Sequence, residues 1–141
     1  MKAYVDANIL LRLLTGEPKD LADRAEGLLR RAELKGLEIV LTPIVLAEVV
    51  YVLEGQYGWA REEIADGLEE IVSDSVVRVV EQAVAIRALA LYRQHRRLDF
   101  ADAYLGAIVE SRSDSVALSF DRDLGRIPSI TVISESKQLE A

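Results

Sequence analysis

Acidic residues recur in this sequence beside short apolar runs. Asp6 follows the run KAYV, Asp121 follows VALSF, and Glu48 is the single charge in TPIVLAEVVYVL. Asp99 and Asp102 lie one helical turn apart in LDFADAYL. Packed carboxylates repel one another and raise one another's pKa unless a cation binds them together. Because these donors are all oxygens, the hard ions Mg²⁺ and Mn²⁺ are favoured over zinc.

Glu48 is the hardest of these acids to explain by structure alone. If its segment is a helix, the neighbours three and four residues away are Ile44, Val45, Tyr51 and Val52, none of which is charged. Moving an unpaired carboxylate into apolar surroundings costs several kcal/mol. We therefore expect a cation and a water molecule to pair with Glu48, which would orient that water or bind the same cation.

The elements that would position these acids alternate along the chain. Short apolar runs predict five strands, at 2–5, 38–42, 76–80, 116–120 and 130–133. Helical spacing predicts helices at 21–34, from Pro43 onward, and at 61–72, 82–96 and 100–111. Gly36 is a plausible C-cap, and Pro43 stands where a first helical residue tolerates proline. Strands that alternate with helices predict an α/β sandwich with a mainly parallel sheet.

Such a sheet would bring the acids to one edge. Asp6 and Asp121 follow the first and fourth strands, and parallel strands end at the same edge. Glu48 falls within the first two turns of the helix after the second strand. The helix before the fourth strand begins near that edge with Asp99 and Asp102. Ligand sites of open α/β sheets lie at the carboxyl ends of the strands, so four or five carboxylates can converge there.

Each aspartate also has a purely structural explanation. Asp99 could be an N-cap, and Asp102 could be favoured by the helix dipole. Asp121 and Asp123 could be turn and cap residues, and Asp6 could be a loop acid before a helix that starts two residues later. The joint placement of the acids, rather than any one of them, favours a metal site.

Composition sets the outer limits. The chain has 141 residues, half of them hydrophobic and 29% charged, which predicts one domain over residues 1–141. The absence of cysteine excludes thiolate metal sites and disulfides. The net charge of −7 argues against a surface that attracts nucleic acid everywhere, but acids at a metal site count toward that total. The apolar segments are too short or too interrupted for a signal peptide or a membrane span, so we expect a cytoplasmic protein.

Taken in order, the segments YVDAN, LAEVVYVL, LDFADAYLGAIVE and LSFDRDL closely resemble PIN-domain ribonucleases of the VapC toxin type. No one segment is specific, but the ordered set spans nearly the whole chain. The resemblance implies a three-layer α/β/α fold with a five-stranded sheet of order 3-2-1-4-5. It also implies a Mg²⁺- or Mn²⁺-dependent endoribonuclease acting on RNA, a homodimer, and inhibition by a cognate antitoxin protein.

The resemblance assigns roles to individual residues. The implied core acids are Asp6, Glu48, Asp102 and Asp121. The implied supporting residues are Asn8, Asp99, Ser119 and Asp123. We expect Asp6 and Asp102 to be the main metal ligands, with Asp121 supporting a metal directly or through water. Whether one or two metals bind stays open.

The densest basic stretch is YRQHRR at 92–97, directly before the acidic helix. Its Arg96 and Arg97 could bring RNA phosphates toward the acids. Alternatively, these cations could cap the C-terminus of a helix, where positive charge is favoured.

Three other functions compete with this interpretation. A haloacid dehalogenase-type phosphatase would need a second aspartate where Asn8 stands, and a lysine after a middle strand, where none occurs. A non-catalytic PIN-like binding domain would be free to lose the acids, yet all four are present. An RNA-processing nuclease that works without an antitoxin uses the same chemistry and stays open.

Overall fold

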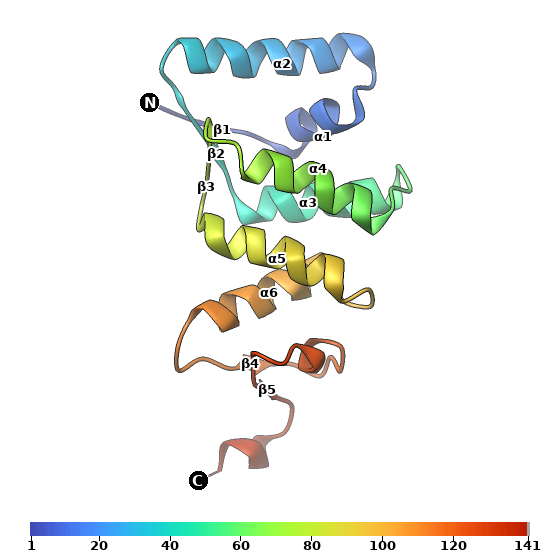
Figure 1. Ribbon diagram of the computed structural model, residues 1–141, viewed down its shortest axis with the longest axis vertical. Coiled ribbons are helices and arrows are strands. Elements are labelled where there is room, and N and C mark those ends of the chain that lie inside the picture. Colours follow the sequence, from blue (N-terminus) through green and yellow to red (C-terminus); the bar gives the residue numbers. More distant parts are fainter. Residues whose placement is uncertain (141) are drawn as a thin grey trace. The chain divides into compact units, whose positions relative to one another are not determined.

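The computed structural model describes residues 1–140 and divides into two compact units, residues 1–82 and residues 83 onward. Figure 1 labels their helices and strands. The first unit contains β1 (Lys2–Tyr4), α1 (Ala7–Thr15), α2 (Lys19–Leu34), β2 (Glu38–Leu41), α3 (Pro43–Gly55), α4 (Arg61–Val72) and β3 (Val77–Val79). The second unit contains α5 (Gln82–Gln94), which begins at the boundary, α6 (Phe100–Ser111), β4 (Ala117–Leu118), β5 (Val132–Ile133) and two 3₁₀ turns, η1 (Leu124–Arg126) and η2 (Ser136–Leu139).

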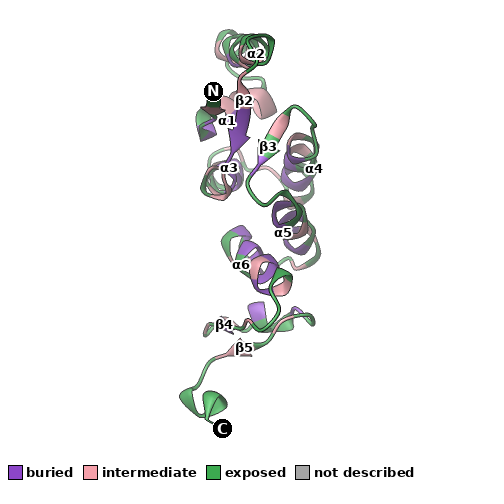
Figure 2. Cartoon of the chain, turned by 90° about the vertical axis from the view of Figure 1, so that its left-hand side faces the viewer, coloured by how far each residue is buried: buried purple, intermediate pink, exposed green. Residues whose placement is uncertain are grey.

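The sheet of the first unit is parallel, with β2 between β1 and β3. Ala3 pairs with Ile39, and Ile39 with Val77, so the three strands run in register. The three apolar residues that end β2 are all buried, so most of β2 is purple in Figure 2. A strand segment buried on both faces has a continuous apolar sequence, as Ile39, Val40 and Leu41 do here.

Helices α1 and α3 pack together in the first unit, and α1 also packs on α2. Gly16 ends α1 in the left-handed conformation, with φ of 68°, and its N–H donates to the Arg12 carbonyl. A residue without a Cβ adopts this conformation without steric penalty. Helix α2 ends at Leu34, and Gly36 follows it in the same conformation, as the sequence predicts.

The core of the second unit lies between α5 and α6. Phe100 meets Tyr92 and Tyr104 edge to face, with ring centroids 5.6 and 5.7 Å apart. Gly106 lets α6 approach the turn after β4, because a Cβ there would lie 2.7 Å from the Ile127 Cδ1 atom. This close approach, together with buried Leu124, holds the loop after β4 against α6.

The strands confirm part of the predicted topology. The pairings β1–β2, β2–β3 and β4–β5 are all parallel, which agrees with the order 3-2-1 and with neighbours 4-5. They form one three-stranded and one two-stranded sheet, so a single five-stranded sheet stays a prediction. The strands are also shorter than predicted, with only two residues each in β4 and β5. No helix within residues 1–140 is both long and apolar enough to cross a membrane.

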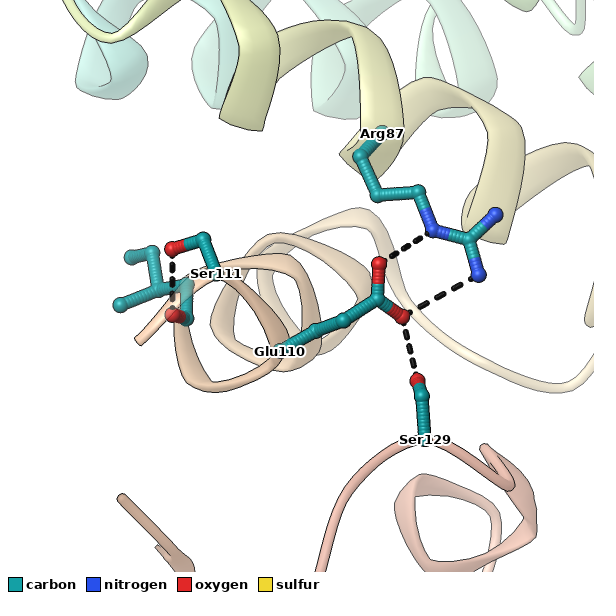
Figure 3. Close-up of polar contacts among 5 residues, drawn as sticks. Arg87, Glu110, Ser111 and Ser129 are labelled. Atoms are coloured by element: carbon teal, nitrogen blue, oxygen red, sulfur yellow. Dashed lines mark hydrogen bonds and ion pairs between the residues drawn. The ribbon is translucent and has the colours of Figure 1, made fainter. Parts of the chain in front are cut away.

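Glu110 near the end of α6 connects three parts of the second unit (Figure 3). Its carboxylate accepts hydrogen bonds from Arg87 Nε at 2.7 Å and Arg87 Nη2 at 3.1 Å, and from the Ser129 hydroxyl. The hydrogen bond from Arg87, together with that from Ser129, holds the pKa of Glu110 below its ordinary value of 4.5, although burial opposes this. A two-point arginine–carboxylate contact is geometrically specific as well as charge-assisted.

We expect Glu110→Gln to lower the free energy of unfolding by about 0.5–1 kcal/mol, because solvent screens a pair whose arginine is 42% exposed. Since folding lowers the pKa of Glu110, the carboxylate stabilises the fold above pH 4.5. That contribution is lost as the pH falls through the lowered pKa. Urea unfolding of both proteins across this pH range would measure the difference.

The matched control is Glu26→Gln, which removes a solvent-exposed pair with Arg30 on α2. We expect that change to leave stability within about 0.5 kcal/mol. Equal losses in the two variants, or a Glu110→Gln effect that persists in acid, would contradict the role given to Glu110.

Candidate functional site

Asp102 and Asp121 form the acidic centre of the second unit. Asp102 stands in the first turn of α6, and Asp121 follows β4 in the loop that packs on that helix. Partial burial raises the pKa of Asp102, and so do the charge of Asp121, a hydrogen bond between the two carboxyl groups, and the charge of Asp99. The sequence predicts this convergence from residues nineteen positions apart, and the structure places the two acids together.

The loop that carries Asp121 is shaped by side chain-to-backbone hydrogen bonds. The Ser119 hydroxyl accepts from the Asp121 N–H at 3.0 Å, and Asp121 Oδ1 accepts from the Asp123 N–H at 2.8 Å. Asp123 in turn pairs with Arg126 at 3.7 Å. Asp121 is therefore a turn residue, as its structural explanation predicts, and it also contacts Asp102. The Ser119 hydroxyl therefore helps to order this loop.

Asp99 occupies the N-cap position of α6, but its side chain makes no capping hydrogen bond. An exposed acid at a helix N-terminus that does not cap the helix keeps both oxygens available. Its charge contributes to the raised pKa of Asp102, so the three acids form one electrostatic group.

Asp6 belongs to the first unit, where it is the N-cap of α1. Its Oδ1 accepts from the Ile9 N–H at 3.1 Å, which fixes the carboxylate and leaves Oδ2 for another partner. Asp6 and Asn8 are both exposed, one residue before α1 and one residue into it. The structural explanation for Asp6, a loop acid before a helix, is thus correct without excluding a second function for its other oxygen.

The expectation that Glu48 lies in costly apolar surroundings is wrong, because its side chain is exposed. Helix α3 buries Leu46, Val49, Val50 and Leu53. The opposite stripe, at spacings of four and three, consists of Ile44, Glu48 and Tyr51. Ile44 and Tyr51 are 78% and 80% exposed, so apolar neighbours in the sequence do not mean burial here. No compensating cation is needed to explain Glu48, although the residue remains available to a substrate.

The predicted acid set draws Asp6 and Glu48 from the first unit and Asp102 and Asp121 from the second. Within neither unit, as far as residue 140, do three acidic or histidine side chains stand close enough to hold a metal ion. The strongest fragment of a metal site is the Asp102–Asp121 pair. A cation would replace the hydrogen bond and repulsion between these carboxyl groups with two favourable contacts, so the donor set fits a hard divalent ion.

The basic residues lie beside this fragment in the chain. Arg96 and Arg97 are exposed and stand in the turn between α5, which ends at Gln94, and α6. They lie two and three residues beyond the end of α5, so the explanation that they cap its C-terminus stays open. As exposed cations three and two residues before Asp99, they remain candidates for phosphate contacts.

Phe120, immediately before Asp121, was not among the residues predicted for the site, and its side chain is 92% exposed. Arg122, on the other side of Asp121, is exposed too. The available signal was the alternation of Val116, Leu118 and Phe120, which lines one face of the predicted strand 116–120 with apolar residues and puts Phe120 next to Asp121 in the chain.

Comparisons with known proteins identify the family of this chain. Residues 3–130 match the PIN domain family, and the chain belongs to that family. Among characterised relatives, it is 27% identical over 128 residues to the VapC ribonuclease of Aquifex aeolicus (strain VF5), covering 91% of this chain and 93% of that protein. No solved structure matches the chain significantly. The family match extends across both structural units.

Proposed function

We propose that this protein is a metal-dependent endoribonuclease that cleaves RNA phosphodiester bonds, as the toxin of a toxin–antitoxin pair. The observation that carries the proposal is the Asp102–Asp121 pair in a chain that belongs to the PIN family. The relative of similar length is itself named a ribonuclease. The test is cleavage of a random-sequence RNA pool with and without EDTA, with the cut positions read by sequencing.

We propose Asp6, Asp102 and Asp121 as the ligands of Mg²⁺ or Mn²⁺, and residues 1–141 as a single nuclease domain. A bound divalent ion supplies charge neutralisation on the phosphate and acidifies a water molecule. Asp121 is held for this task by the Asp123 N–H, and Asp6 by the Ile9 N–H, so neither carboxylate must lose much rotamer freedom on binding.

Glu48 would orient the attacking water through its carboxylate and accept the proton that the water loses. An exposed glutamate on a helix whose opposite face is buried suits this function, because the helix fixes its backbone while its carboxylate stays accessible. Asn8, Asp99, Ser119 and Asp123 would support the acids. Among these, Ser119 would act by accepting the hydrogen bond from the Asp121 N–H. Asp99 would act by adding negative charge beside Asp102, which attracts a cation.

Arg97→Ala should weaken RNA binding. It should also reduce the slope of the logarithm of the binding constant against the logarithm of the salt concentration by about 0.7, the value for one phosphate contact on a single strand. The physical reason is that each phosphate neutralised by an arginine releases bound counterions. A salt titration of binding to a single-stranded RNA probe measures the slope.

Arg30→Ala is the matched control, because Arg30 is an exposed arginine on α2 that pairs with Glu26. We expect it to leave the slope unchanged. If Arg97→Ala also left it unchanged, the turn between α5 and α6 would not be on the RNA path.

As partners we propose a cognate antitoxin protein and a second copy of the chain, on the resemblance to VapC toxins. An RNA-processing nuclease that has no antitoxin is the alternative. A co-purifying small protein that inhibits RNA cleavage would support the toxin, whereas full activity in cells that tolerate the protein would favour the alternative.

A further inference from the structure

Helix α6 and the turn after β4 meet at two places that are one helical turn apart. Asp102 on α6 shares a hydrogen bond with Asp121 at the start of the turn. Gly106 lies four residues further along α6 and therefore on the same face of the helix. A Cβ at Gly106 would lie 2.7 Å from the Ile127 Cδ1 atom and 3.6 Å from the Leu124 Cδ1 atom, at the end of the turn. Both contacts thus join one helix face to one turn.

Hydrogen bonds connect this turn from its start to its end. Asp121 Oδ1 accepts from the Asp123 N–H at 2.8 Å, and the Asp123 carbonyl accepts from the Arg126 N–H at 3.1 Å. The Leu124 carbonyl accepts from the Ile127 N–H at 3.2 Å. Because these hydrogen bonds follow one another along the chain, we expect the turn to move as one piece. A displacement of Ile127 would then also displace Asp121.

Gly106 is unfavourable for the helix that contains it. Glycine in a helix interior is destabilising relative to alanine, because its backbone loses more conformational freedom on folding. The close approach of the turn gives a physical reason for a glycine at this position. Ile127 and Leu124 are fully buried. Leu91 Cδ1 lies 3.8 Å from the same Cβ position, so side chains packed around Gly106 have little room to rotate away.

We propose that Gly106 is a positioning residue of the metal site, which admits the turn against α6 and thereby sets how closely Asp121 approaches Asp102. This inference rests on the proposed function, in which these two carboxylates hold Mg²⁺ or Mn²⁺. A side chain at position 106 would push the turn away from α6 and would move Asp121 away from Asp102. Since a hard divalent ion needs its carboxylate oxygens within a narrow range of distances, its affinity should then fall.

The experiment measures Mn²⁺ binding to the whole chain by isothermal titration calorimetry, with thermal melting of each variant in parallel. Gly106→Ala adds the one methyl group that would collide with the turn. Gly106→Ala/Ile127→Val keeps that methyl group and removes Cδ1, the atom that it would meet at 2.7 Å. Gly67→Ala on α4 is the matched control, because a Cβ there would lie 2.9 Å from the Leu14 Cδ2 atom in the first unit.

We expect Gly106→Ala to raise the Kd for Mn²⁺ about tenfold, the scale typical of residues that orient metal ligands. Gly106→Ala/Ile127→Val should restore the wild-type Kd, and Gly67→Ala should leave it unchanged. An unchanged Kd in Gly106→Ala would overturn the inference. Equal losses of affinity in the single and double variants would do so too, because the collision with Ile127 would then not be the cause. So would a loss in Gly67→Ala as large as that in Gly106→Ala.

A second variant tests the same contact if Gly106→Ala does not fold. Ile127→Ala removes the side chain that fits against Gly106, so the turn loses its fixed separation from α6. This variant should also raise the Kd for Mn²⁺, and an unchanged Kd would overturn the inference.

A titration of RNA cleavage with Mn²⁺ separates this inference from the proposed function. Gly106→Ala should require about ten times more Mn²⁺ to reach half of its maximal rate, and it should keep most of that rate at saturating Mn²⁺. If the wild type binds Mn²⁺ and cleaves RNA while Gly106→Ala requires no more Mn²⁺, only the positioning function of Gly106 fails. If the wild type neither binds Mn²⁺ nor cleaves RNA, the ribonuclease function fails and this inference fails with it.

Discussion

Asp102→Asn should reduce Mn²⁺-dependent RNA cleavage by about a thousandfold or more. Asparagine has nearly the same shape but carries no charge, so the pair with Asp121 loses half of its anionic donor set. Loss of about 4 kcal/mol of transition-state stabilisation corresponds to a thousandfold in rate, and metal-assisted charge stabilisation is of that order. Single-turnover cleavage of a mixed RNA pool measures the effect. Asp6→Asn and Glu48→Gln, in the first unit, should show the same loss.

The fold of Asp102→Asn should remain intact. Without metal, Asp102 is destabilised as an anion by burial and by the charge of Asp121, so its amide should leave the melting temperature unchanged or slightly higher. Asp114→Asn is the matched control in the same unit. Asp114 is exposed with φ of 60°, a conformation that asparagine tolerates, and its substitution should not alter cleavage. Retention of a tenth of the wild-type rate by Asp102→Asn would contradict the assignment.

The part of the site that sequence could predict is the part fixed by strand and helix ends. Asp121 follows β4 and Asp102 opens α6, so a parallel α/β arrangement alone brings them near each other. Helix ends were equally readable: α4 and α6 match the predicted bounds 61–72 and 100–111, and Gly36 follows α2. These features depend on local chemistry, namely amphipathic spacing, an acid at a helix start, and a glycine without Cβ strain.

The sequence could not predict which face of α3 is buried. Its residues are apolar on nearly every side, so the pattern gives no direction for the buried face. The structure buries Leu46 and Leu53 and leaves Ile44 and Tyr51 in solvent with Glu48 between them. Contacts between distant side chains, such as Arg87 with Glu110 and Ser129, leave no trace in local spacing either. The strand predicted at 116–120 was one residue too long at its start and two at its end, because the paired length of a strand depends on the partner strand.

Saturating Mn²⁺ should raise the melting temperature of the wild type by several degrees. A ligand at a hundred times its Kd stabilises the folded state by about 2.7 kcal/mol, provided that it does not bind the unfolded chain. For a chain of this size, that free energy corresponds to a shift of several degrees. The physical reason is that Asp102, Asp121 and Asp99 repel one another in the metal-free protein, and a cation relieves that repulsion. The measurement is a melting curve with EDTA and with increasing Mn²⁺, and it requires no knowledge of the RNA target.

The variants make this shift diagnostic for the proposed site. Asp102→Asn should lose most of the Mn²⁺-induced shift, because it removes charge from the pair that binds the ion. Glu110→Gln should keep the full shift from a lower starting temperature, because Glu110 is committed to Arg87 and Ser129 at the other end of α6. Equal shifts in the wild type and Asp102→Asn would show that Mn²⁺ binds elsewhere, and a wild type with no shift would favour a non-catalytic PIN domain. A shift that disappears in Asp102→Asn but not in Glu110→Gln would connect the ion to the same residue whose loss abolishes cleavage.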